Sequence, residues 1–295
     1  MALALPWDYA LGIAGACAVA GVGATVLAGG RESRRMQATG AFLREAAVVI
    51  GLYALWQAVG GLSRGDTAGA FARAAWIDHA QSTIGLPSEA AMQHLVLWSS
   101  ALTQGANIYY AVVHFPATIA LLIWLFVRHR ADYARARTVL ALTTFLCLAI
   151  QLVPVAPPRL TPGIVDTAVL YGQSVYGGGV GADELSAMPS VHVAWALAVG
   201  WYVWRVAAGR WRVTGPIHAG MTLFVVIVTG NHWWLDGVAA ALVLVVSGLA
   251  VAGAYRAVAL RSIRGSEQHH RRWRPVTDAA WLPDDAGPFP SSESG

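Results

Sequence analysis

The sequence predicts an all-α fold: a polytopic membrane helical bundle of about seven transmembrane helices, with amphipathic helices at the membrane surface. Hydrophobic residues make up 56% of the chain and charged residues only 12%, about half the charged share of an ordinary soluble domain. Several stretches of about 17–25 residues carry almost no charge, which is the length that a helix needs to cross a bilayer. Arginines gather at the ends of these stretches.

The arginines predict how the spans are oriented. The expected spans cover about residues 9–29, 43–62, 107–127, 138–155, 190–205, 214–231 and 234–256. All 20 basic residues are arginine, and a seven-span arrangement leaves only Arg64, Arg73 and Arg159 on the side opposite to the rest. The positive-inside rule then predicts a multi-pass cell-membrane protein with a cytoplasmic C-terminus. No basic residue precedes the first apolar run, so we expect a retained span and not a signal peptide.

The same pattern divides the chain into four parts. We expect two N-terminal transmembrane helices in residues 1–62 and an extracytoplasmic amphipathic helical segment in 63–106. Residues 107–260 form a membrane domain that carries the polar motifs. The hydrophilic stretch 261–295, rich in Ser, Pro and Asp, is expected to be a disordered cytoplasmic tail.

Within 63–106, the run Gly85-Leu86-Pro87-Ser88 followed by Glu89 predicts a helix break and a new helix start. Acidic and histidine side chains also occur in this segment: Asp78, His79, Glu89 and His94. Their spacing is not that of metal ligands, so we expect them on the solvated faces of surface helices. Cys17 and Cys147 lie in apolar runs, and we predict neither a disulfide nor a metal site built on sulfur.

Arg159 lies at the expected outer end of a span, behind three prolines at 154, 157 and 158. A guanidinium there offers a planar fork for two phosphate oxygens. The alternative is an arginine that only extends from the membrane to the headgroup region. The scarcity of arginine on this side favours a phosphate site, and the loop 156–189 that follows is long enough to be functional.

Ser190 is a good N-cap for the apolar helix expected from residue 191, and His192 lies two residues further on. Free N–H groups and the helix dipole make such a position favourable for an anion. A histidine there can protonate a departing oxygen. Taken alone, the tetrapeptide fits an ordinary capped helix equally well.

His232 and Asp236 are four residues apart at the start of the last expected span, which places them on one face of a helix. Asp236 can accept the Nδ1 proton of His232 and leave Nε2 as a nucleophile. A helix-stabilising pair is the alternative, but an aspartate at a membrane edge is costly without a partner. Arg159, His192 and His232 are all predicted at outer span ends, so we expect them to meet around one phosphate group.

Three motifs occur in order: APPR at 156–159, MPS-x-H at 188–192 and GNH-x-x-x-D at 230–236. In this order and spacing the chain resembles the type-2 phosphatidic acid phosphatase superfamily, and within it the inositol phosphorylceramide synthase-like phosphotransferases. The likeness covers about residues 105–240 and includes 107–110 and 114–116.

The resemblance implies a role for each motif residue. His232 attacks phosphorus and forms a phosphohistidine, Asp236 orients it, His192 protonates the leaving group, and Arg159 holds phosphate oxygens. No metal or other cofactor is implied. The resemblance also makes 107–260 a catalytic, phosphatase-like domain that acts on a membrane lipid phosphate.

Two cations of the wider superfamily are missing, because Leu152 and Val226 stand at their positions, and Val191 replaces a usual glycine. These departures resemble the inositol phosphorylceramide synthase-like branch. We expect Ser190, Asn231 and helix N–H groups to help hold the phosphate. Tyr110 and His114, one helical turn apart, are expected either to line the pocket or to form an interhelical hydrogen bond.

We therefore expect a metal-independent lipid phosphatase or phosphotransferase with an extracytoplasmic site, which transfers its group to water or to a polar alcohol. The net charge of +4 is not a nucleic-acid signature, and no such partner is expected. The alternative is a transporter or lipid-binding protein that keeps a phosphate pocket without turnover. Transporters usually contain internal repeats, and we find none in this sequence.

Overall fold

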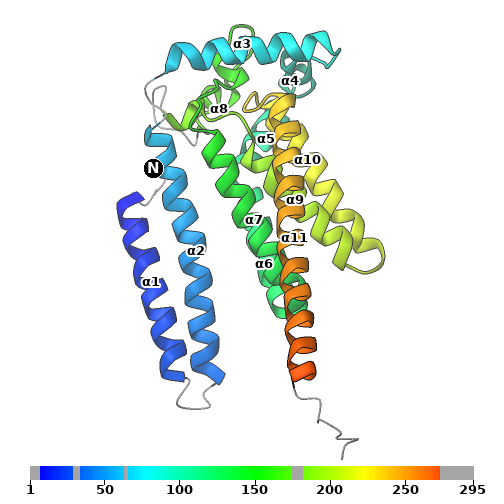
Figure 1. Cartoon of the computed structure of the whole chain (residues 1–295). Helices are drawn as coiled ribbons and strands as arrows, with labels where there is room; N and C mark the ends of the chain where they lie inside the picture. Colours follow the sequence, from blue (N-terminus) through cyan, green and yellow to red (C-terminus); the bar gives the residue numbers. More distant parts are fainter. Residues whose placement is uncertain (1–6, 29–33, 63–65, 175–181, 273–295) are drawn as a thin grey trace, which may run out of the picture. The chain divides into compact units, whose positions relative to one another are not determined.

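The structure, a computed structural model, describes residues 7–28, 34–62, 66–174 and 182–272. In these residues the regular secondary structure is helical, apart from one isolated bridge between Val155 and Ser186, which confirms the all-α prediction. The α-helices are α1 (Trp7–Ala28), α2 (Arg34–Leu62), α3 (Thr67–Thr83), α4 (Glu89–Leu97), α5 (Ser100–Val112), α6 (His114–Arg128), α7 (Arg130–Ile150), α8 (Thr167–Leu170), α9 (Val191–Val206), α10 (Thr214–Val228) and α11 (Trp234–Arg272) (Figure 1). The 3-10 helices are η2 (Pro158–Leu160), η3 (Ala182–Leu185) and η4 (Gly209–Val213).

A helix occupies each of the expected spans, but the count of seven is not established. Within the described residues, α1, α7, α11 and α10 extended by η4 are long and apolar enough to cross a membrane, which makes four, and the bent pair α5–α6 makes a fifth. Helices α2 and α9 are not among them. Helix α9 has 16 residues and is only about 24 Å long at the usual rise per residue, short of a full hydrocarbon core.

The span expected at 107–127 is two helices, α5 and α6, which meet at Val113 with a bend of 45°. Pro116 accounts for the bend, because it has no N–H to donate to the carbonyl of Val112 and its ring clashes with that carbonyl. The sequence analysis did not predict this break. The bend places the His114 end of α6 close to the start of α9, since the rings of His114 and His192 are in contact.

The segment expected to form amphipathic surface helices contains α3 and α4, and α3 lies across the bundle at the end where α10 and α11 meet (Figure 1). Gly85 has φ +75° and Ser88 caps α4 through Ala91 N–H at 3.2 Å, so the predicted break and restart are confirmed. The Arg73 guanidinium donates to Pro154 O at 2.6 Å. A buried apolar cluster joins α3 to the 155–187 region and to Trp233: Ala70, Ala74, Ile77, Val155, Ala156, Leu185, Ala187 and Trp233.

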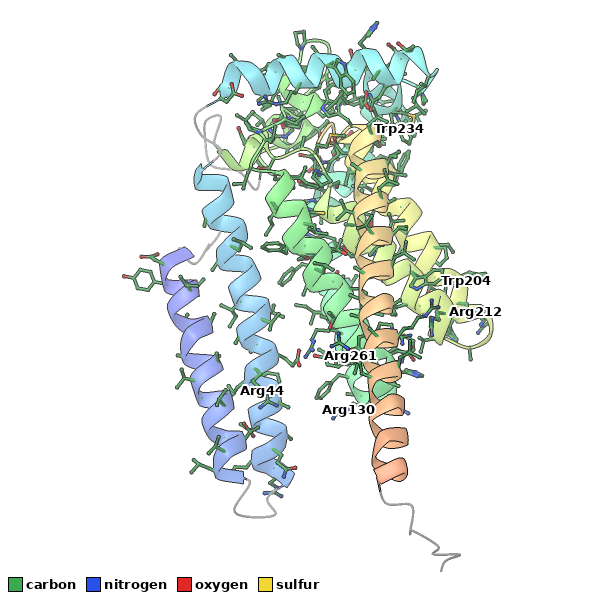
Figure 2. The ribbon with its side chains drawn as sticks, in the orientation of Figure 1. Arg44, Arg130, Trp204, Arg212, Trp234 and Arg261 are labelled. Carbon is green, nitrogen blue, oxygen red and sulfur yellow. The ribbon has the colours of Figure 1, made fainter. Side chains whose placement is uncertain are left out.

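The turns that carry Arg130 and Arg212 lie at the end of the helical bundle opposite to α3. In Figure 2, Arg130 and Arg212 are far from Trp234, which marks the first turn of α11.

The chain separates into two compact units, residues 1–251 and 252–295. Helix α11 continues to Arg272, so the part of the expected tail from 261 to 272 is helical, and residues 234–274 contain no proline. Residues 273–295 lie outside the described residues, as do Gly177, Gly178 and Gly179 of the long loop.

Candidate active site

Helix α9 begins where the sequence predicted. Ser190 is its N-cap and its hydroxyl oxygen accepts from Val193 N–H at 3.2 Å. The residues before the cap are held by Gln151, whose amide donates to Pro189 O at 2.9 Å and to Ser186 O at 3.3 Å. His192 is therefore the second residue of a helix whose start is fixed from two sides.

A tight turn between α10 and α11 carries the second histidine. Gly230 has φ +69°, a left-handed conformation that glycine adopts without strain. The N–H groups of Asn231 and His232 both donate to Val226 O, at 3.0 and 3.1 Å. The turn is thereby tied to the last turn of α10, and His232 precedes α11 by two residues.

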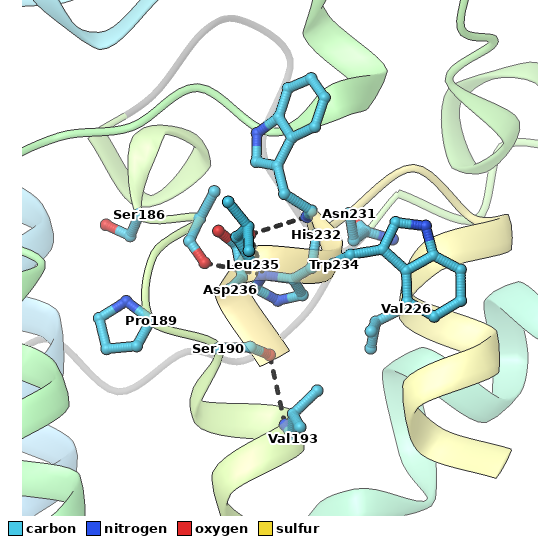
Figure 3. A network of polar contacts seen from close by, with 12 residues as sticks. Ser186, Pro189, Ser190, Val193, Val226, Asn231, His232, Trp234, Leu235 and Asp236 are labelled. Carbon is cyan, nitrogen blue, oxygen red and sulfur yellow. Dashed lines mark hydrogen bonds and ion pairs between the residues drawn. The ribbon is translucent and has the colours of Figure 1, made fainter. Parts of the chain in front are cut away.

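His232 and Asp236 form the predicted pair, with Nδ1 and Oδ2 3.2 Å apart (Figure 3). They do not share a helix face as expected, because His232 lies in the turn before α11. The Nδ1 atom also lies 2.8 Å from Ala187 O. Since both neighbours are acceptors, Nδ1 must carry the proton and Nε2 the lone pair. In the described part of the chain the buried Nε2 has no hydrogen-bond partner. The geometry thus leaves one nitrogen of His232 ready to act as a nucleophile.

Asp236 makes a second hydrogen bond in the same turn. Its Oδ2 accepts from Trp233 N–H at 2.8 Å, so it caps the N-terminus of its own helix. The side chain is fully buried. A buried carboxylate of this kind is held in one orientation by two donors, and its position relative to His232 is set by the first turn of α11.

The two histidines predicted from separate motifs lie together. Their ring centroids are 5.5 Å apart. His192 also contacts Tyr110, at 4.6 Å between centroids, and His114, at 4.2 Å in an edge-on arrangement. The sequence left two interpretations of Tyr110 and His114 open. The structure places both against His192, and they line a narrow pocket with it, Tyr109, Thr222, Val225 and Val226.

Arg159 is buried beside the turn that carries His232. Its backbone N–H donates to Gly230 O at 2.7 Å, and its Nε donates to Asn231 Oδ1 at 3.1 Å. Two carboxylates of the long loop face the guanidinium: Nη1 is 3.0 Å from Asp166 Oδ2 and 3.7 Å from Glu184 Oε1. Arg159 therefore belongs to the same cluster as His232, and its charge is balanced inside the protein.

Ser190 and Asn231 were predicted to contact phosphate. Ser190 is fully buried and its oxygen caps α9. Asn231 uses its oxygen for Arg159 and its amide nitrogen for Thr229 Oγ1, at 2.8 Å. In this arrangement Asn231 orients the guanidinium, and a direct contact with phosphate would require one of these bonds to break. Their phosphate-binding role stays a prediction.

Several residues around the site were missed by the sequence analysis. Asp166 and Glu184 lie in a loop with no periodic pattern, and nothing in the sequence links them to Arg159. Gln81 belongs to no motif in the sequence, and Glu89 is predicted to lie in solvent. That expectation is wrong, because Glu89 is only 1% exposed. It lies under α3, where its carboxylate accepts hydrogen bonds from Gln81 Nε2 at 2.9 Å and from Trp234 N–H at 3.3 Å.

In the part of the chain that the structure describes, no group of three His, Cys, Asp or Glu side chains is placed to share a metal ion.

A family model described as the PAP2 superfamily matches residues 75–250, which is more than half of the chain. The matched region includes Arg159, His192, His232 and Asp236. No curated protein and no solved structure matches the sequence.

Proposed function

The chain belongs to the PAP2 superfamily, whose members are generally phosphatases or phosphotransferases. From this premise we propose that it is a membrane enzyme that cleaves a lipid phosphoester or pyrophosphate through a phosphohistidine on His232. We further propose that the reaction needs no metal and that the site opens to the extracytoplasmic face of the cell membrane. The observation that carries the proposal is the state of His232: buried, with Nδ1 between two acceptors and Nε2 unpaired within the described residues.

The first step is attack by the Nε2 lone pair of His232 on phosphorus. The bond between phosphorus and the leaving oxygen breaks as the N–P bond forms, and His192 gives a proton to that oxygen. The ring centroids of His192 and His232 are 5.5 Å apart, which supports the proposal that both histidines act on the same phosphoryl group. Asp236 stabilises the charge that develops on His232, in the manner of an orienting carboxylate.

The second step restores the enzyme. The oxygen of water or of an alcohol attacks phosphorus, His192 takes its proton, and the N–P bond breaks so that Nε2 regains its lone pair. Arg159 stabilises the negative oxygens in both steps. Because Asp166 and Glu184 already face its guanidinium, the phosphate must compete with these carboxylates for Arg159.

The acceptor decides between a phosphatase and a phosphotransferase. Val226 lines the pocket beside His192 and His114, at the position where the wider superfamily has an arginine. The absence of that cation supports the inositol phosphorylceramide synthase-like branch and a polar alcohol as acceptor.

The test is mass spectrometry of lipid and soluble products from the purified full-length protein in lipid micelles. The donors are phosphatidic acid, an isoprenyl pyrophosphate and phosphatidylinositol, each with and without inositol or glycerol. We expect a product that requires His232, so that His232→Ala abolishes it, and an acid-labile phosphoryl or phospho-headgroup adduct on His232. If wild-type protein and His232→Ala give the same products with every donor, the proposal is wrong, and vesicle uptake or lipid binding unchanged by His232→Ala would favour a transporter or lipid-binding protein.

A further inference from the structure

The first turn of α11 has donors that a helix cannot satisfy by itself. The first N–H groups of any α-helix point out of its N-terminus without intrahelical partners. In α11 these belong to Trp234 and Leu235, directly after His232 and Trp233. Because Trp234 and Leu235 are half-buried, an N–H group left without an acceptor there costs free energy.

The acceptors come from the α3–α4 segment, about 150 residues earlier in the chain. Trp234 N–H donates to Glu89 Oε1 at 3.3 Å, and Leu235 N–H donates to Gln81 Oε1 at 3.1 Å. The Trp234 indole N–H donates to Pro87 O at 2.8 Å. The end of α3 and the start of α4 thus cap α11 from outside.

The cap is a connected pair of side chains. Gln81 Nε2 donates to Glu89 Oε1 at 2.9 Å, and the two side chains are 3% and 1% exposed. Burial raises the pKa of the Glu89 carboxyl above its usual value, so the site disfavours the charge. What the cap requires from residue 89 is therefore an acceptor oxygen in the right place.

We propose that Gln81 and Glu89 are positioning residues for the His232–Asp236 pair, and this inference rests on the proposed function. Asp236 is the third residue of α11, and its carboxylate reaches back to both Trp233 N–H and His232 Nδ1. If the first turn frays, the carboxylate moves away from His232. The cap therefore holds the nucleophile in place without touching the substrate.

The experiment compares three full-length variants with a matched control. Glu89→Ala removes the acceptor, Glu89→Gln keeps an oxygen in its place, and Gln81→Leu removes the second acceptor. Asp78→Ala is the control, because Asp78 is an exposed acidic residue of the same segment. Amide hydrogen exchange of residues 232–240 reports fraying directly, and kcat and KM are measured with the donor that the wild type turns over.

We expect Glu89→Ala and Gln81→Leu to exchange at least about tenfold faster at 232–240, since each removes the acceptor of a half-buried N–H group in the first turn of α11. In both, kcat falls about tenfold or more while KM changes less than about threefold, because the lost interaction is not with substrate. Glu89→Gln restores slow exchange and most of kcat, and Asp78→Ala behaves as wild type.

Unchanged exchange at 232–240 in Glu89→Ala overturns the inference, and so does a Glu89→Gln variant as impaired as Glu89→Ala. If Glu89→Ala does not accumulate as folded protein, Gln81→Leu decides in the same way with Glu89 in place. If the wild type turns over no donor, the proposed function fails, whereas the exchange measurement still decides whether the cap holds the His232 turn.

Discussion

Replacing Asp236 by asparagine tests how the nucleophile is prepared. The amide oxygen of the new side chain can still accept from Trp233 N–H, so the helix cap is kept and the charge beside His232 is lost. The Nδ1 proton keeps a second acceptor, because Ala187 O lies 2.8 Å away, closer than Asp236 Oδ2 at 3.2 Å. The tautomer that leaves Nε2 free is thus retained in the variant.

The expected loss is that of one charge-assisted hydrogen bond, about 1.5–3 kcal/mol, which corresponds to a decrease in kcat of about 10- to 150-fold. This is far less than the loss expected for His232→Ala, which removes the nucleophile. The assay is single-turnover formation of the phosphohistidine and steady-state kcat with the same donor.

Asp236→Ala provides the control, because it removes the helix cap together with the charge and should lose more activity than Asp236→Asn. A decrease of about 10⁴-fold in Asp236→Asn, the size of loss that a wrong histidine tautomer causes in a serine protease, would refute the reasoning. It would mean that Ala187 O does not hold the Nδ1 proton and that the carboxylate alone sets the tautomer.

Four further predictions follow from the site. His192→Ala should lower kcat about 10²- to 10⁴-fold for a donor with a basic leaving group and much less for a good leaving group, which a series of substituted phenyl phosphates measures; equal losses across the series would contradict a proton donor. Arg159→Lys keeps the charge but loses the fork and the bond from Nε to Asn231, so kcat/KM should fall about 10- to 100-fold; unchanged kinetics would exclude bidentate binding. Gly230→Ala forces a side chain to φ +69°, with its Cβ 3.0 Å from Ile164 Cγ2, and should cost about 1–2 kcal/mol in a denaturation assay in detergent, whereas an unaltered midpoint would show that the turn relaxes. Burial raises the pKa of Glu89, so the native state favours the protonated carboxyl. This contribution to stability is complete below the pKa of the unfolded state and is lost as pH rises through the pKa of the folded state. Glu89→Gln should therefore be at least as stable as wild type at neutral pH, with the difference in Tm shrinking in acid; a Tm difference independent of pH would contradict this.

The helices could be predicted from hydropathy because each apolar stretch is long and its flanks are charged or polar. The starts of α9 and α11 were predicted within a residue, since Ser190 is a strong cap and the turn before Trp234 contains Gly230. The bend at Val113 was missed, although Pro116 was a visible signal for it. The number of helices that cross the membrane depends on length: α9, at 16 residues, is too short for the usual criterion.

The core of the site was predictable because its chemistry sits in compact motifs. His232 and Asp236 are only four residues apart, so the carboxylate of Asp236 in the first turn of α11 can reach back to His232 in the turn before the helix. The supporting contacts were not predictable in this way. An amphipathic pattern shows which face of α4 is polar, but not that Glu89 is covered by the first turn of α11. The partners of Arg159 in the loop, Asp166 and Glu184, follow from no local rule.

The direct attachment of Arg159 to the turn of His232 has a consequence for how the protein responds to its bilayer. The bond from Arg159 N–H to Gly230 O and the bond from Nε to Asn231 join the arginine to the residues next to the nucleophile. If the spans tilt in a thicker or thinner membrane, the Arg159 guanidinium and the His232 imidazole then move together as a rigid unit. We expect lipid thickness to alter how easily a substrate enters, and to leave the spacing of the reacting groups unaltered.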